Sequence, residues 1–312
     1  MIQFLRLIRW PNLLIIILSM AFMLYFLINP MLGMITGEAG LNYLEFGLLV
    51  IATVFISIGG YLINDFFDMD IDEVNKPGKN QVGRYFSVYS VQVMYWIFTV
   101  LGILAGVLLS WMLNQINYSL LFVFCAGLLW FYSERYQNIP IVGNLVIASL
   151  SALSFGIVWL FQFFALSNDP HFFVTVQASF PLVNRLVLIY MAFAFLTSLL
   201  REFVKDIEDI KGDERFGSRT FAVVFGERKA RYFASVFALI GLAGSIWIQV
   251  IFLNFKFWIL FGYFFLLDAM FVTILFWIFR ANESSNYRWL SNFIKILMLL
   301  GVLSMLLFYL ET

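Results

Sequence analysis

"INDFFDMDIDE", residues 63–73, gathers four aspartates and one glutamate within eleven positions. The rest of the chain is very different: 62% of its 312 residues are hydrophobic, only 12% are charged, and the mean hydropathy is +0.92. This composition lies far from that of a soluble domain and is typical of a polytopic membrane protein. So much negative charge in so apolar a chain indicates a specialised segment.

Hydropathy predicts an all-α membrane protein. A helix needs about 20 mostly apolar residues to cross the hydrocarbon layer, and nine such stretches occur, near residues 12–30, 44–64, 89–112, 117–133, 140–163, 185–204, 231–253, 256–279 and 291–310. No alternating strand pattern or linker is visible, so we expect one helical domain over residues 1–312. The first stretch lacks an A-x-A-like cleavage site, and we interpret it as a retained span.

Basic residues predict the orientation of the bundle, because Lys and Arg are retained in short cytoplasmic loops. With the N-terminus inside, 17 of the 19 basic residues lie on the cytoplasmic side, and only Arg185 and Lys256 lie outside. We therefore expect an integral protein of the cell inner membrane, with residues 63–73 and a cavity facing the cytoplasm. The net charge is zero, and no nucleic-acid partner is expected.

The spacing of the aspartates indicates a shared chemistry. Asp65, Asp68 and Asp72 lie at i, i+3 and i+7, which places three carboxylates along one face of a helix. The segment "LLREFVKDIEDIKGDERFGSRTF", residues 199–221, repeats this spacing at the end of the sixth span with Asp206, Asp209 and Asp213. Each group precedes a loop rich in Lys, Arg and Gly, as in a weak internal repeat.

Two facing carboxylate groups suit a magnesium diphosphate site. Carboxylates are hard oxygen ligands, and Mg²⁺ commonly takes one or two of them together with water and substrate phosphate oxygens. The interleaved bases Arg201, Lys205 and Arg219 are the side-chain types that contact phosphate. The alternative interpretation is a solvated helix end in which these acids and bases only pair with one another.

These segments resemble a known family. "NDFFDMDID" is similar to the N-D-x-x-D-x-x-x-D motif of UbiA-type intramembrane prenyltransferases, and "KDIEDIKGD" is similar to their second Asp-rich motif. Nine spans, with the motifs after the second and the sixth, match that architecture over the whole chain. Together with "GNLVIASLSALSFG", residues 143–156, the motifs look most like the geranylgeranylglycerol-phosphate geranylgeranyltransferase branch.

The resemblance implies a Mg²⁺-dependent enzyme that transfers a polyprenyl group, geranylgeranyl in this branch, from its diphosphate to a lipophilic acceptor in the membrane. Metal binding and catalysis are expected from Asp65, Asp68, Asp72, Asp206, Asp209 and Asp213. Substrate contacts are expected from Asn64, Arg135, Asn144, Arg201, Lys205 and Arg219. The preferred acceptor is the hydroxyl of geranylgeranylglycerol phosphate, and the alternative is the aromatic ring of a quinone precursor.

One departure from the family pattern concerns the acceptor. After Tyr132 the relatives' usual Lys is replaced by Gln137, and Arg135 is a candidate for the missing positive charge. Asn64 is expected either to orient a carboxylate or to cap a backbone group. Three aromatic side chains beside the motif are candidates for stabilising a carbocation: Tyr61, Phe66 and Phe67.

The remaining polar features allow a structural explanation. Asp268, near the middle of the eighth span, is expected to face the interior or to be protonated; a structural hydrogen bond is the favoured role, and a functional role is the alternative. Cys125 is expected to pack inside the fourth span, and His171, the only histidine, to lie at the outer surface. A cation transporter is a weaker alternative because coupling-ion sites lie near the bilayer midplane. A phosphatidyltransferase is disfavoured because its D-G-x-x-A-R opening is absent.

Overall fold

The computed structural model describes residues 2–34, 39–75 and 81–311. In these residues the chain forms helices joined by turns, with no β-strand. Nine helical stretches are long and apolar enough to span a membrane: Trp10–Met31, Tyr43–Phe67, Val88–Met112, Ile116–Glu134, Val142–Ser167, Pro170–Glu208, Glu227–Phe255, Trp258–Arg280 and Ser284–Glu311. The predicted all-α fold is therefore confirmed for the described part of the chain. Lys76 and Lys79, two of the predicted cytoplasmic bases, lie outside it.

The spans are assembled from elements of different length. In chain order these are α1 (Ile2–Leu7), α2 (Trp10–Phe22), η1 (Met23–Ile28), α3 (Asn29–Met31), α4 (Tyr43–Phe67), α5 (Met69–Asn75), α6 (Val88–Met112), η2 (Ile116–Ser119), α7 (Leu120–Glu134), η3 (Tyr136–Asn138), α8 (Val142–Ser167), α9 (Pro170–Val176), η4 (Gln177–Ser179), α10 (Phe180–Glu208), α11 (Ile210–Phe216), α12 (Phe221–Phe225), α13 (Glu227–Phe255), α14 (Trp258–Arg280) and α15 (Ser284–Glu311).

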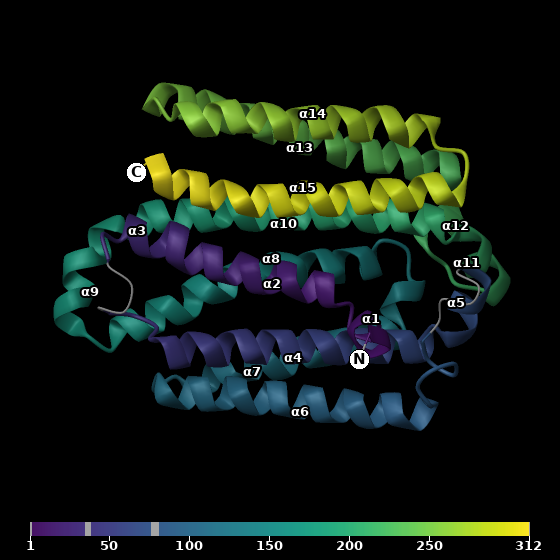
Figure 1. Ribbon diagram of the computed structural model, residues 1–312, viewed down its shortest axis with the longest axis horizontal. Coiled ribbons are helices and arrows are strands. Elements are labelled where there is room, and N and C mark those ends of the chain that lie inside the picture. The colour runs from purple at the N-terminus through teal and green to yellow at the C-terminus, as the bar shows by residue number, and fades with distance from the viewer. Residues whose placement is uncertain (1, 35–38, 76–80, 312) are drawn as a thin grey trace.

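The long helices run side by side (Figure 1). From one edge of the bundle to the other they follow the order α14 and α13, then α15 and α10, then α2 and α8, and finally α4, α7 and α6. The short helices α5, α11 and α12 lie together at one end, and α9 lies at the opposite end (Figure 1). This arrangement brings the two segments that carry the aspartate motifs to the same end of the molecule.

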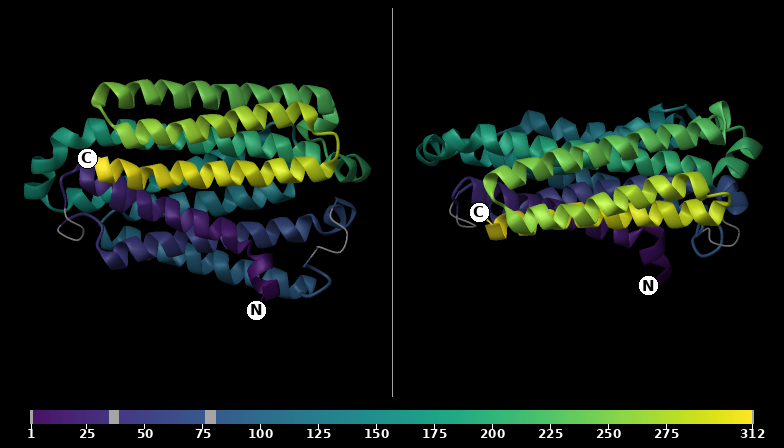
Figure 2. Two further views of the ribbon diagram at one scale, coloured as in Figure 1. Left: turned by 45° about the horizontal axis from the view of Figure 1, so that its top comes forward. Right: turned by 90° about the horizontal axis from the view of Figure 1, so that it is seen from above.

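The first span is interrupted at its start. Arg9 has left-handed backbone angles, φ 53° and ψ 49°, and separates α1 from α2. Figure 2 shows α1 turned away from the direction of α2. Pro11 lies in the first turn of α2, where a proline is tolerated because the first amide groups of a helix have no intrahelical acceptor. The break leaves Arg9 at the edge of the bundle interior.

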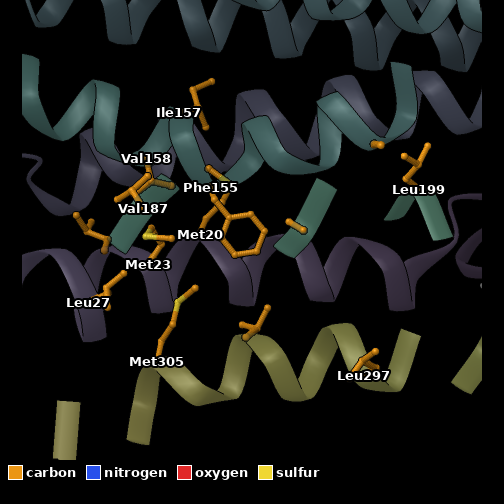
Figure 3. Packing of buried hydrophobic residues seen from close by; sticks show 14 of the residues in the cluster. Met20, Met23, Leu27, Phe155, Ile157, Val158, Val187, Leu199, Leu297 and Met305 are labelled. Atoms are coloured by element: carbon orange, nitrogen blue, oxygen red, sulfur yellow. The ribbon is translucent and has the colours of Figure 1, made fainter. Parts of the chain in front are cut away.

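Apolar side chains from sequence-distant helices fill the bundle. Figure 3 shows Phe155 of α8 beside Met20 of α2 and Met23 of η1, with Met305 of α15 on the neighbouring helix. All four side chains are buried in one large apolar cluster. Lipid tails are as apolar as these side chains, so this packing stabilises the helices mainly through close van der Waals contact.

Several helices extend past the predicted spans. The sixth was predicted over residues 185–204, whereas α10 begins at Phe180 and ends at Glu208. The ninth was predicted over 291–310, whereas α15 begins at Ser284. Hydropathy marks the residues that face hydrocarbon, while polar residues at a helix end continue the same backbone hydrogen bonding into the interface. Helix α9, in the predicted outer loop, begins where Asp169 accepts a hydrogen bond from the Phe172 amide at 3.1 Å.

Close contact between α4 and α6 depends on Gly102. A Cβ atom at this position would lie 3.0 Å from the Ile56 nitrogen and 3.1 Å from the Ala52 oxygen, both backbone atoms of α4. Backbone atoms cannot move aside without displacing the helix. We therefore expect Gly102→Ala to lower the stability of the protein by about 1–3 kcal/mol, measured as a lower midpoint of thermal unfolding in detergent.

A matched control is available in Gly127 of α7, where an added Cβ would meet no atom within 4 Å. Gly127→Ala should leave the unfolding midpoint unchanged or raise it slightly, because alanine favours the helical backbone. Equal midpoints for the two variants would show that α4 and α6 are not in the close contact described.

Candidate active site

Each aspartate motif is built around a break between a long helix and a short one. Asp68 ends α4 with φ −90° and ψ 6°, and Asp209 ends α10 with φ −94° and ψ 1°. A seven-residue helix follows each of them, α5 in the first case and α11 in the second. The middle aspartate of each motif therefore occupies the same conformation, and the predicted repeat extends to the backbone. We call the two segments, residues 64–72 and 205–213, the first and second junctions.

The two junctions lie against each other, because α5 and α11 pack together at one end of the bundle (Figure 1). Asp68 of the first junction and Asp213 of the second are close enough to interact electrostatically. Asp213 is buried, and Asp65, Asp68, Asp206 and Asp209 are half-buried. The structure thus brings the two predicted carboxylate groups to one place.

Amide side chains orient the first junction. Asn64 Nδ2 donates hydrogen bonds to Asp68 Oδ2 at 2.7 Å and to Gln137 Oε1 at 2.9 Å. Gln137 Nε2 in turn donates to Asp68 Oδ1 at 2.7 Å. Of the two roles expected for Asn64, the structure shows the orientation of a carboxylate. Gln137, which appeared in the sequence only as a departure from the family pattern, holds the same carboxylate from the other side.

Arg9 is a member of this site that sequence reasoning missed. Its guanidinium forms an ion pair with Asp65, donates a hydrogen bond to Asn64 Oδ1 at 3.3 Å, and lies 5.0 Å from the centre of the Tyr61 ring. In the sequence Arg9 served only as one of the cytoplasmic bases. The signal that could have distinguished it is its place directly before "WPN", where a helix has to begin anew.

The second junction has its own partners. Asn144 Nδ2 of α8 donates to Asp206 Oδ2 at 3.0 Å, so the predicted Asn144 reaches the site. Thr220 Oγ1 donates to Asp213 Oδ2 at 3.1 Å. Lys205 interacts electrostatically with carboxylates of both junctions, among them Asp68 and Asp213. Lys205 is therefore the cation that the two motifs share.

The oxygen atoms of the junctions fit Mg²⁺. Among the described residues, no three His, Cys, Asp or Glu side chains meet at a single preformed metal site. A Mg²⁺ ion does not require one, since it commonly uses one or two carboxylates and completes its octahedron with water and phosphate oxygens. All donors here are oxygens, and the neighbouring carboxylates repel one another until a cation is bound.

One cavity adjoins the junctions and continues into the bundle. Its volume is about 390 Å³. At the end near the junctions it is lined by the polar side chains Arg9, Asn12, Tyr61, Asn64, Tyr132, Arg201, Glu202, Lys205 and Lys295. Farther along, the lining is mostly apolar and includes Phe122, Phe155 and Phe264. The cavity thus has a charged end and an apolar end, which suits one elongated amphipathic ligand.

Three predicted substrate contacts do not line this cavity. Asn144 is one of them, and its side chain donates to Asp206 instead. Arg135 and Arg219 have exposed side chains, and neither lines the cavity. Arg135 therefore does not replace the positive charge that the family pattern led us to expect; the position beside Asp68 is occupied by the neutral Gln137. The reason is local, because Arg135 ends α7 and faces solvent, while Gln137 lies in the following turn and points inward.

We call the two sets of motif aspartates the stripes: Asp65, Asp68 and Asp72 form the first, and Asp206, Asp209 and Asp213 the second. The neighbouring acids outside the stripes have other surroundings. Asp70, Glu73 and Glu214 are exposed. Glu208 is buried and accepts a hydrogen bond from Arg288 Nε at 2.8 Å. The exposed acids are solvated, and Glu208 joins α10 to α15.

Of the aromatic candidates, only Tyr61 lines the cavity. Phe66 and Phe67 pack against each other, and Phe67 also contacts Trp130 edge to face. Their side chains belong to the apolar packing beneath the first junction.

Three further expectations can be compared with the structure. Asp268 on α14 lies near Ser245 and Gln249 of α13. Its Oδ1 atom forms no hydrogen bond within the described residues, so the expected structural hydrogen bond stays a prediction. Cys125 is half-buried and lines the cavity. His171 is exposed on α9, as predicted.

Comparison with known proteins now identifies the family. The family model described as the UbiA prenyltransferase family matches residues 26–300. The chain belongs to this family. It is accordingly an integral membrane prenyltransferase, as the two motifs and the nine spans led us to expect.

Relatives within the family share most of the chain. The digeranylgeranylglyceryl phosphate synthase of Thermococcus kodakarensis is 29% identical over 278 residues, which cover 88% of this chain and 90% of that protein. The enzyme of the same name from Sulfurisphaera tokodaii is 31% identical over 200 residues, which cover 63% of this chain and 64% of that protein. These names agree with the branch that the motifs resemble.

Solved structures share the fold. A structure from work on digeranylgeranylglyceryl phosphate synthase in membranes has a TM-score of 0.62 and 23% identity, covering 99% of this chain and 98% of its own. A UbiA homologue from Archaeoglobus fulgidus bound to GPP and Mg²⁺ has a TM-score of 0.61 and 14% identity, and the match covers 97% of this chain and 99% of that one.

The electrostatics of the site predict how magnesium affinity depends on pH. Burial, with a contribution from Asp72, raises the pKa of the Asp68 carboxyl to about 6, and burial together with Asp209 raises the pKa of Asp213 to about 6. Protons therefore compete with the metal below this pH. Between pH 7.5 and pH 5, we expect the Mg²⁺ concentration for half-maximal diphosphate release to rise by about tenfold for each of the two carboxyls that binds metal.

The measurement is a Mg²⁺ titration of diphosphate release at both pH values, with the ionic strength held constant. An unchanged half-maximal concentration would mean that both carboxyls are already ionised at pH 5, and would contradict the description of a buried site.

Proposed function

We propose that this enzyme transfers a geranylgeranyl group from its diphosphate to the hydroxyl of geranylgeranylglycerol phosphate, which forms an ether-lipid precursor. The observation that carries the proposal is the cavity, which joins a charged end beside two aspartate junctions to an apolar end inside the bundle. A prenyl diphosphate has the same division. The names of the relatives favour the glycerol phosphate acceptor.

The diphosphate would bind at the junctions. Its Mg²⁺ ions would be held by carboxylates of Asp65, Asp68, Asp72, Asp206, Asp209 and Asp213. When bound, Mg²⁺ supplies Lewis-acid stabilisation of the negative charge that develops on the leaving diphosphate. Arg9 and Lys205 line the cavity beside the junctions and add hydrogen-bond donors and positive charge for the phosphate oxygens. Asn64 and Gln137 keep the Asp68 carboxylate directed into this site.

The rest of the cavity would hold the prenyl chain and keep water away. As the bond between C1 and the diphosphate oxygen breaks, the electron pair leaves with the diphosphate and C1 becomes positively charged. Aromatic faces attract such a cation by about 0.5–2 kcal/mol each. Tyr61 and Tyr132 line the cavity at its polar end, where C1 would lie. Phe122 and Phe155 line its apolar continuation and exclude water from the chain.

The acceptor hydroxyl must lose a proton as its oxygen bonds to C1. Among the described residues, Glu202 is the one acidic side chain that lines the cavity. Glu202 is buried, and its Oε1 accepts a hydrogen bond from Arg201 Nη1 at 2.6 Å, which fixes the direction of the carboxylate. We assign Glu202 as the proton acceptor. A weak base is sufficient here, because an alcohol oxygen becomes strongly acidic while it bonds to carbon.

The site would face the cytoplasm. The two junctions lie at the end of the bundle opposite α9 (Figure 1), and Lys256, one of the two bases predicted outside, lies between α13 and α14 at the other ends of those helices. The concentration of Lys and Arg at the junction end supports this orientation. A lipid acceptor could enter sideways from the membrane, while the diphosphate donor and Mg²⁺ would come from the cytoplasmic side.

A product assay tests the reaction. Purified protein is incubated with labelled geranylgeranyl diphosphate, Mg²⁺ and either geranylgeranylglycerol phosphate or an aromatic quinone precursor. We expect ether-lipid product that disappears with EDTA and falls by about 100-fold or more in Asp65→Asn and in Asp209→Asn.

The controls are Asp70→Asn and Glu214→Gln, which remove one exposed negative charge each from positions off the stripes and should keep activity within about twofold. Equal losses in stripe and control variants would refute the assignment of the aspartates. Transfer only to the aromatic acceptor would keep the chemistry and refute the acceptor.

A second variant tests the proton acceptor. Glu202→Gln keeps the shape of the side chain and a hydrogen-bonding group for Arg201, but it cannot accept the proton. We expect kcat to fall by about 100-fold or more while the KM for the diphosphate donor stays within about threefold. A rise in donor KM with unchanged kcat would show that Glu202 serves binding instead.

A further inference from the structure

Lys295 is an intramembrane cation that the proposed reaction has not used. It lies eleven residues after the start of α15 at Ser284, which places it roughly 16 Å along the helix at 1.5 Å per residue. Its side chain is half-buried and lines the cavity. Ionisable side chains at such positions face the protein interior and usually have a partner or a ligand.

The pairing of α10 with α15 places Lys295 beside Arg201. The two helices run in opposite directions (Figure 1), and their register is fixed by the hydrogen bond from Arg288 to Glu208. Seven residues, or two turns, separate Arg288 from Lys295, and seven separate Glu208 from Arg201. Lys295 and Arg201 therefore lie on the facing sides of the two helices, two turns deeper in the bundle than Arg288 and Glu208. Electrostatic interactions of Lys295 with Arg201 and Glu202 agree with this placement.

Positive charge at this depth exceeds the negative charge. Glu202 pairs with Arg201, and no carboxylate of a described residue forms an ion pair with Lys295. The Nε of Arg201 is buried and has no hydrogen-bond partner in the described chain. Two cations thus share one carboxylate. Unpaired buried charge is costly, and a second anion would offset that cost.

The donor diphosphate already has other cations. Arg9 pairs with Asp65, and Lys205 directly precedes Asp206 of the second junction. Arg201, in contrast, lies eight residues before Asp209, roughly 12 Å away along α10 at 1.5 Å per residue. An anion held by Arg201 and Lys295 would therefore lie deeper than the diphosphate, next to Glu202.

We propose that Lys295 and Arg201 bind the phosphate group of the lipid acceptor. This inference rests on the proposed function and specifies how the acceptor is chosen. In any glycerol phosphate the free hydroxyl is one or two carbons from the phosphate-bearing carbon. Holding the phosphate on Arg201 and Lys295 thus brings the hydroxyl to Glu202, the adjacent residue of α10. An acceptor without a negative charge would leave the two cations with only the Glu202 carboxylate to share.

The test compares wild-type protein with Lys295→Met, Lys295→Arg and, as a matched control, Lys229→Met. Lys229 is exposed on α13 and does not line the cavity. For each protein we would measure the KM of geranylgeranylglycerol phosphate, the KM of geranylgeranyl diphosphate, and the rate with geranylgeranylglycerol, which lacks the phosphate. Glycerol phosphate would be tested as an inhibitor that competes with the acceptor.

We expect Lys295→Met to raise the acceptor KM and the inhibition constant of glycerol phosphate by about tenfold or more. The donor KM should stay within about twofold, and the rate with the uncharged alcohol should not change. Lys295→Arg should restore most of the acceptor affinity, and Lys229→Met should behave as wild type. A normal donor KM in Lys295→Met also establishes that the variant is folded.

Three results would overturn the proposal. An equal rise in donor and acceptor KM would assign Lys295 to the diphosphate. A lower kcat with both KM values unchanged would make Lys295 a counter-ion that only positions Glu202. An acceptor KM equal to that of wild type would leave Lys295 without a binding role. If wild-type protein transferred to no glycerol phosphate at all, the proposed function itself would fail, which is a different outcome from these.

Discussion

Mutual repulsion among carboxylates is the constraint on which the rest of this structure depends. Two groups of aspartates meet at the edge of a layer of low dielectric constant, where neither water nor distance screens them well. The neighbouring side chains compensate for this repulsion in two ways. Arg9 and Lys205 supply positive charge, while Asn64 and Asn144 donate neutral hydrogen bonds that fix the direction of a carboxylate without removing its charge. The site is therefore ordered but remains acidic, which is the condition for binding a divalent cation together with a diphosphate.

The two junctions share one backbone arrangement. Each places its middle aspartate at the end of a long helix, with backbone angles that differ by only a few degrees between Asp68 and Asp209. The helix then resumes as a seven-residue segment, so that the first and last aspartates of the motif flank the break. Because α5 and α11 pack together, the two breaks face one site. The break is also the point where the chain passes from the apolar span to the polar end of the bundle, which explains why the acidic residues accumulate there.

The sequence predicts the spans and the motifs because both are local properties. Hydropathy over about 20 residues finds each helix, and the i, i+3, i+7 spacing finds the aspartates. The missed contacts are all long-range. Arg9 meets Asp65 across 56 positions and Gln137 meets Asp68 across 69, and neither pairing leaves a periodic signal. Arg135 was predicted to supply the positive charge missing at Gln137, because charge is visible in a sequence, whereas the direction of a side chain in a turn is not. In the sequence, Lys295 was only one of the basic residues that predicted the orientation. Its position beside Arg201 depends on the register of α15 against α10, which the sequence does not show.

Gln137 has a consequence for how charge is divided within the cavity. A lysine beside Asp68, the residue that the family resemblance led us to expect, would neutralise that carboxylate and add a cation at the donor end. Glutamine instead forms hydrogen bonds with both Asp68 and Asn64 and leaves the charge of the carboxylate intact. Arg201 and Lys295, the two cations that share the Glu202 carboxylate, lie two helical turns deeper than the hydrogen bond between Arg288 and Glu208. In the proposed reaction, a site organised in this way would separate the two anionic substrates by depth: the magnesium diphosphate would be held where the carboxylates are, and a phosphate-bearing acceptor would be attracted to the cations beyond it. The same separation would keep the two negatively charged groups from competing for one set of bases.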